Sequence, residues 1–195
     1  SLLELSPRNE SALQLLAQIY IDMEQYDKGV EIYERLIACN GEDTKSGTQY
    51  RLRLIALYME TGRFDEAKRE LRWFLDHSSY VDKLAIVEHY KRICREHDEW
   101  EEQLEILNCE LGYYLHEKTC SVESLIDRKE VVRGIAGIDH VLREYADICH
   151  CKLQRMDEAA RIYRFLLERK PDDGYLKDRL EEIGREGNHG AGNLG

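Results

Sequence analysis

The sequence has little proline and no long apolar run. Only 2 of its 195 residues are proline, while Leu, Glu, Arg, Ala and Lys are plentiful, a composition that favours helices. No apolar segment approaches the roughly 18 residues that a membrane-spanning helix needs, and no basic-then-apolar leader is present. We therefore expect a helical protein with no membrane segment in this stretch. The six cysteines fit reduced, mostly buried thiols, so we also expect a cytoplasmic location.

Positive charge is also scarce. The chain has 28 Lys and Arg residues against 39 Asp and Glu, which gives a formal net charge of −11. A protein that binds nucleic-acid phosphates needs a positive surface to displace counterions, so we expect no nucleic-acid partner. A helical-repeat RNA binder stays as the less favoured alternative, because hairpin repeats of similar length can bind single strands.

Common metal-site and catalytic motifs are missing. The six cysteines form no C-x₂-C pair, and the chain has neither H-E-x-x-H nor G-x-S-x-G. Cys149-His150-Cys151 suggests zinc, but neighbouring side chains on a helix point about 100° apart, which favours structural thiols. GAGNLG at 190–195 lacks the strand and helix that a dinucleotide site requires. We predict no enzyme activity, no cofactor and no metal.

The sequence does contain one amphipathic phrase several times. It reads QYDKGVEIYERLI at 25–37, RFDEAKRELRWFL at 63–75 and RMDEAARIYRFLL at 155–167, with a degenerate copy, EWEEQLEILNCEL, at 99–111. Apolar residues recur at helical spacing, and an acid near each start meets the positive end of a helix dipole. Three copies then carry a small residue, at Gly29, Ala67 and Ala159. Small side chains at a recurring position predict that another helix passes close by.

A second helical segment precedes each phrase, for example at 12–23 and at 50–62, where Gly62 is expected to cap the helix. Each unit is thus a helical hairpin. One amphipathic hairpin cannot bury its own apolar face, so we expect the hairpins to stack on their neighbours.

The pattern resembles the tetratricopeptide repeat family over roughly residues 1–180. The positions that carry the resemblance in the first copy are Leu13, Leu16, Ala17, Tyr20, Tyr26, Gly29, Tyr33 and Leu36. The resemblance implies an all-α fold: a right-handed α-solenoid of stacked antiparallel helix hairpins with a C-terminal capping helix. The copies start at Tyr26, Phe64, Trp100 and Met156, at intervals of 38, 36 and 56 residues, longer than the family's period of about 34.

We predict one such domain over 1–187. Its expected parts are the end of a preceding repeat (1–8), repeat 1 (9–42), repeat 2 (47–79), a degenerate repeat 3 (80–117), an insertion (118–139), repeat 4 (140–172) and the capping helix (173–187), followed by a flexible tail (188–195). In the insertion we expect a lengthened third hairpin or an extra helix. The departures from the family pattern are Gln103, Glu110, Asp147 and His150.

The resemblance also implies a groove, lined by the first helix of each hairpin, that often holds peptides. We therefore predict a non-catalytic scaffold that binds a peptide or protein partner. The predicted groove residues are Gln14, Gln18, Arg53, Met59, His89, Arg92, Arg95 and Tyr145. Their three arginines suggest an anionic or C-terminal peptide segment, although salt bridges to Glu88 and Glu96 are the plainer interpretation. The lysines and asparagines of a chaperone-carboxylate clamp are missing from the matching positions.

Self-association is the alternative function. The chain starts with Ser1 and opens with LLELSPRN, which resembles the end of a repeat. We therefore expect an excised segment whose open N-terminal repeat face docks a second copy or another part of a larger protein.

Overall fold

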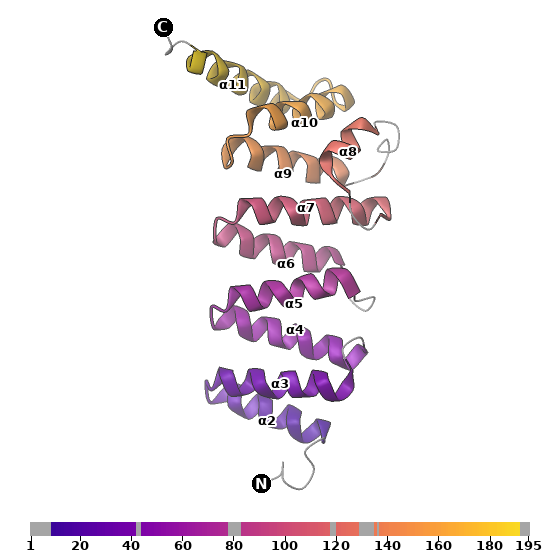
Figure 1. Ribbon diagram of the computed structural model, residues 1–195, viewed down its shortest axis with the longest axis vertical. Coiled ribbons are helices and arrows are strands. Elements are labelled where there is room, and N and C mark those ends of the chain that lie inside the picture. Colours follow the sequence, from indigo (N-terminus) through magenta and orange to yellow (C-terminus); the bar gives the residue numbers. More distant parts are fainter. Residues whose placement is uncertain are drawn as a thin grey trace. The chain divides into compact units, whose positions relative to one another are not determined.

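The computed structural model describes residues 9–41, 44–77, 83–117, 120–128, 135 and 137–191. Within those ranges it has ten helices and no strand (Figure 1). The predicted all-α class of paired helices is confirmed. The chain divides into two compact units, residues 1–93 and 94–195. In the described ranges, no helix is long and apolar enough to cross a membrane.

Unit 1 is built from consecutive antiparallel helices (Figure 1). They are α2 (Glu10–Asp22), α3 (Tyr26–Asn40), α4 (Lys45–Glu60), α5 (Phe64–His77) and most of α6 (Lys83–Glu96). Packing joins α2 to α3, α3 to α4 and α4 to α5. The core consists of apolar side chains that recur at helical spacing, among them Leu13, Ala17, Leu36, Leu54, Leu71 and Phe74. Burying this stripe is what makes isolated amphipathic helices stable together.

The turn inside each hairpin contains one residue in the left-handed backbone conformation. These residues are Glu24, Gly62, Asp98 and Gln154, with φ of 58°, 70°, 57° and 57°. Each stands two residues before the start of α3, α5, α7 or α10. Glycine takes this conformation without steric cost, whereas Glu24, Asp98 and Gln154 take it at a steric cost. The left-handed residue at the same position of each turn shows that the four hairpins repeat one local feature.

The small residue of the first phrase lies at a close helix contact, and those of the second and fourth phrases are buried. A Cβ atom added to Gly29 of α3 would lie 3.4 Å from Ile21 of α2 and 3.6 Å from Leu57 of α4. Ala67 and Ala159 have no exposed surface. At Gly29 the expectation that another helix passes close by is confirmed.

Unit 2 contains the end of α6 and five further helices. They are α7 (Trp100–Leu115), α8 (Val122–Asp127), α9 (Ile138–Cys151), α10 (Met156–Arg169) and α11 (Gly174–Ala191). Packing joins α7 to α9, α9 to α10 and α10 to α11, around a core that includes Leu107, Leu111, Val141, Leu142 and Tyr163.

The short helix α8 lies within the stretch predicted as an insertion. Its Val122 and Leu125 are buried in the core of unit 2, and the Ser121 hydroxyl caps it by accepting the N–H of Ser124 at 3.2 Å. Helix α11 continues to Ala191, past the predicted tail start at 188. Residues 1–8 and 192–195 lie outside the described ranges, and the division into one domain stays a prediction.

Candidate functional site

The structure distributes the predicted groove residues over both units. In unit 1, Gln14, Gln18, Arg53, His89 and Arg92 are exposed and Met59 is half-buried. In unit 2, Arg95 is exposed, whereas Tyr145 is only 7% exposed. The Tyr145 hydroxyl donates to Glu158 at 3.1 Å, so this ring belongs to the core and not to a surface that a partner would contact.

A pocket of about 340 Å³ opens in unit 2 between the end of α6, the start of α7 and one face of α9. Arg95 comes from α6, and Trp100 and Gln103 come from α7. The face of α9 runs from His140 to Lys152, just past the end of the helix, at spacings of three and four residues, which place side chains on one side of a helix. Its residues are His140, Arg143, Glu144, Asp147, Ile148, Cys151 and Lys152.

Glu144 holds together the wall formed by α6, α7 and α9. Its Oε1 atom accepts from Arg95 Nη1 at 3.2 Å and from Gln103 Nε2 at 2.8 Å. Gln103 stands where the other copies have a small residue, and it is only 1% exposed. The longer side chain is therefore tolerated because its amide reaches a carboxylate across the hairpin boundary.

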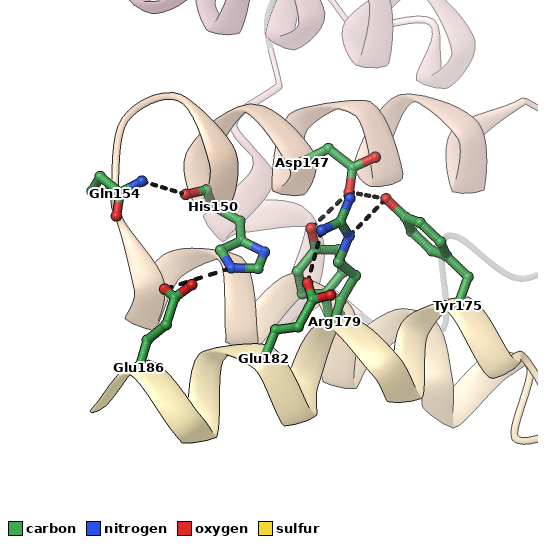
Figure 2. A network of polar contacts seen from close by, with 8 residues as sticks. Asp147, His150, Gln154, Tyr175, Arg179, Glu182 and Glu186 are labelled. Carbon is green, nitrogen blue, oxygen red and sulfur yellow. Dashed lines mark hydrogen bonds and ion pairs between the residues drawn. The ribbon is translucent and has the colours of Figure 1, made fainter. Parts of the chain in front are cut away.

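Asp147 connects the pocket wall to α10 and α11. Its Oδ1 atom accepts the hydroxyl of Tyr163 at 2.7 Å and that of Tyr175 at 2.6 Å; Figure 2 shows the Tyr175 contact. Burial raises the pKa of Tyr163, and the hydrogen bond to the Asp147 carboxylate raises it further. The two tyrosines thus act as neutral donors to this carboxylate.

Arg143 makes the second link to α11. Its Nη2 atom donates to Asp173 at 2.5 Å, and its guanidinium lies 5.0 Å from the centre of the Tyr175 ring. Asp173 also caps α11 by accepting the N–H of Leu176 at 3.3 Å. Partial burial works to raise the pKa of Asp173, but the cap bond and Arg143 outweigh it and lower this pKa below its usual value.

The Cys149-His150-Cys151 sequence is divided between the core and the pocket. Cys149 is fully buried, and burial raises the pKa of its thiol to about 12. His150 is 4% exposed, meets the Tyr163 ring edge-on, and places Nε2 3.9 Å from a Glu186 carboxylate oxygen (Figure 2). Cys151 is exposed at the pocket. The three side chains therefore have separate surroundings.

One other group of potential metal ligands exists among the described residues. Donor atoms of Cys94, Glu99 and Glu102 lie within 4.8 Å of one another. All three also interact within the protein, and we assign no ion to them.

Lys152 lines the pocket at the C-terminal end of α9. Its ammonium lies 4.6 Å from the centre of the Trp100 ring. The predicted groove residues do not include Lys152, Trp100 or Arg143. On α9 the prediction named Tyr145 alone, and it took groove residues only from the first helix of each hairpin, whereas Trp100 begins the second helix α7. Continuing the spacing of three and four residues from Glu144 through Ile148 would have reached Lys152.

Comparison with known proteins gives one match within unit 1. The sequence model of the tetratricopeptide repeat family matches residues 10–41, which contain α2 and α3. Residues 10–41 are therefore similar to a tetratricopeptide repeat. Tetratricopeptide repeats generally mediate protein–protein interactions, and their fold is typically a non-catalytic scaffold.

Two solved structures of putative kinesin light chain tetratricopeptide-like repeats from Podosopora anserina are similar to this chain. Both are 18% identical in sequence and match 92% of the chain. One, the structure of a substituted variant, is matched over 94% of its own length with a TM-score of 0.38, and the other over 97% with a TM-score of 0.37. No curated protein matches the chain.

Proposed function

We propose that this chain is a non-catalytic scaffold that binds a peptide or protein partner, and that the pocket between α6, α7 and α9 is a contact site. The proposal depends chiefly on one observation: a pocket of about 340 Å³ with an aromatic ring, an apolar Ile148 and several charged groups at its edge. Concave, partly apolar sites with a few polar groups are where polypeptide segments and small ligands bind.

A second surface for partner contact is proposed in unit 1, on its exposed polar residues. Gln18 and Arg53 are exposed on α2 and α4, and His89 is exposed on α6. Of these, Gln18 is engaged within its own helix, since its amide donates to Asp22 at 2.8 Å. We propose that Arg53 and His89 are the main residues of unit 1 that contact a partner.

Two exposed thiols supply the test for the pocket. Cys151 lines the pocket and Cys39 lies in unit 1, and both are exposed. Peptides would first be selected on the wild-type chain from a phage-displayed library of random dodecapeptides. Two variants would then be alkylated with the same bulky maleimide. Cys39→Ser with Cys109→Ser takes the adduct at Cys151, and Cys151→Ser with Cys109→Ser takes it at Cys39.

Alkylation at Cys151 is expected to abolish binding of the selected peptides, measured by fluorescence anisotropy, because the adduct fills the pocket. The matched adduct at Cys39 should leave binding unchanged. If both adducts bind the peptides equally well, or if the library yields no binder, the pocket is not a polypeptide contact site.

Self-association is the second candidate, and an apolar stripe on α2 favours it. Leu15 and Ile19 of α2 and Met23, the residue that follows the helix, are spaced by four residues and are 59%, 43% and 58% exposed. Contiguous exposed apolar surface is typical of interaction sites. Light scattering over a wide concentration range should show an oligomer that Leu15→Glu with Ile19→Glu dissociates. A monomer at every concentration would exclude this function.

A further inference from the structure

The charged groups of the pocket differ in how they are neutralised. Arg95 is paired with Glu144, and Arg143 with Asp173. Asp147 accepts two tyrosine hydroxyls. The carboxylates at the pocket are therefore already occupied by donors, and two of its three cations already have a carboxylate.

Lys152 differs from the two arginines. It is exposed at the pocket edge, and among the described residues no carboxylate pairs with it. Its ammonium instead lies against the Trp100 ring. A ring face attracts a cation but leaves its charge uncompensated, so the ammonium can still bind an anion. The C-terminal end of α9 keeps Lys152 in place, since its backbone N–H donates to Ile148 at 3.0 Å.

We infer that Lys152 determines the specificity of the pocket, by pairing with an acidic side chain of a bound polypeptide segment. The inference rests on the proposed function and names the chemistry of the partner. The acidic group binds at Lys152, and the residue next to it packs on Trp100 and Ile148, which supply the apolar part of the pocket. Charge complementarity favours an acidic partner over a basic one. Glu144 and Asp147 already accept hydrogen bonds from protein donors, so they are not available to pair with a basic side chain of the partner.

This assignment moves the anion-binding position away from the arginines that the sequence suggested. Arg95 belongs to the pocket, but Glu144 neutralises it and Gln103 holds Glu144 in place. A partner carboxylate at Arg95 would have to displace an existing ion pair, whereas one at Lys152 displaces only water.

The test combines changes in the protein and in the probe. The probes are the dodecapeptides selected on the wild-type chain, synthesised with a fluorophore, and their versions with each Glu or Asp changed to Gln or Asn. The protein variants are Lys152→Met, the conservative Lys152→Arg, and Lys177→Met. Lys177 is an exposed lysine on α11 that does not line the pocket, so its variant is a matched control for the loss of one positive charge.

On the wild-type chain, one acid-to-amide change in the peptide is expected to weaken binding about fivefold, the upper end for a partly exposed ion pair. On Lys152→Met the same change should have no effect. Lys152→Arg should restore the dependence, and Lys177→Met should behave like wild type. Far-ultraviolet circular dichroism checks that each variant keeps its helices.

The outcomes separate the inference from the function on which it rests. If the selected peptides lack acidic residues, or if the acid-to-amide penalty persists in Lys152→Met, the role of Lys152 is overturned while the pocket remains a binding site. If binding survives alkylation at Cys151, the pocket itself is excluded and both proposals fall.

Discussion

The second and fourth hairpins carry different chemistry at equivalent positions of their first helix. Seven residues before the left-handed turn residue, α4 has Ile55 and α9 has Asp147; four residues before it, α4 has Tyr58 and α9 has His150. Tyr58, Ile55 and His150 are all buried. The backbone of the hairpin is thus independent of whether these positions are apolar or polar.

The fourth hairpin can hold Asp147 where the second has Ile55 because the neighbouring side chains differ. Asp147 receives hydroxyls from Tyr163 of α10 and Tyr175 of α11. At the place of Tyr163, the second hairpin has Leu71, which is 1% exposed and offers no donor. A polar residue is therefore stable in the fourth hairpin only because other helices supply its partners, and those partners fix α11 against α9.

The largest effect should come from moving the polar residue into the second hairpin. Ile55→Asp places a carboxylate at a buried position of a hairpin that has Leu71 where the fourth hairpin has Tyr163, and it should lower the free energy of unfolding by about 4 kcal/mol. Urea unfolding followed by circular dichroism measures this loss. Ile55→Val, which keeps the site apolar, should cost about 1 kcal/mol. Equal losses in the two variants would mean that the surroundings of Ile55 already accept a polar group.

The reverse change in the fourth hairpin should cost less. Asp147→Ala leaves the buried Tyr163 hydroxyl and the half-buried Tyr175 hydroxyl without their acceptor, which should cost about 2 to 3 kcal/mol. Adding Tyr163→Phe and Tyr175→Phe removes the unpaired donors and should recover about half of this loss. Thermal unfolding of the three proteins tests the idea. If the additional changes make the loss larger, the tyrosines stabilise α11 by packing and not through Asp147.

The turn residues allow a comparison of the same backbone with and without a side chain. Gly62 and Gln154 share the left-handed conformation. Gln154→Gly should stabilise the fourth hairpin, and Gly62→Ala should destabilise the second, each by about 1 kcal/mol. Denaturation midpoints of the two variants should therefore move in opposite directions. A loss of stability in Gln154→Gly would show that the 3.4 Å contact of its amide with the His150 carbonyl outweighs the backbone strain.

Local features of this chain were predictable from its sequence because they depend on neighbours along the helix. The second helix of each hairpin begins at the expected residue, at Tyr26, Phe64, Trp100 and Met156. Periodic apolar residues and a small contact residue are sufficient to place these helices.

The site was only partly predictable, because its contacts join residues that are far apart in the sequence. Arg95 pairs with Glu144, 49 residues away, and Arg143 pairs with Asp173, 30 residues away. No spacing rule indicates such pairs. The departures from the repeat pattern were the useful signal, since Gln103 and Asp147 both line the pocket. A polar residue at a core position needs a partner, but one sequence does not say which residue provides it.

The smallest effect concerns a position at which the first hairpin differs from the second and fourth by a single methyl group. Gly29 occupies the position of Ala67 and Ala159, and a Cβ atom there would contact Ile21 and Leu57 at distances close to ordinary van der Waals separation. Gly29→Ala should therefore fit, and it should raise the free energy of unfolding by about 0.5 to 1 kcal/mol, because glycine inside a helix costs conformational entropy. Gly29→Val is the matched control, since a branched side chain cannot fit between α2 and α4 and should destabilise the hairpin. If Gly29→Ala also destabilised it, α2 and α4 would be held closer to α3 than alanine allows, and the first hairpin would be packed more tightly than its later copies.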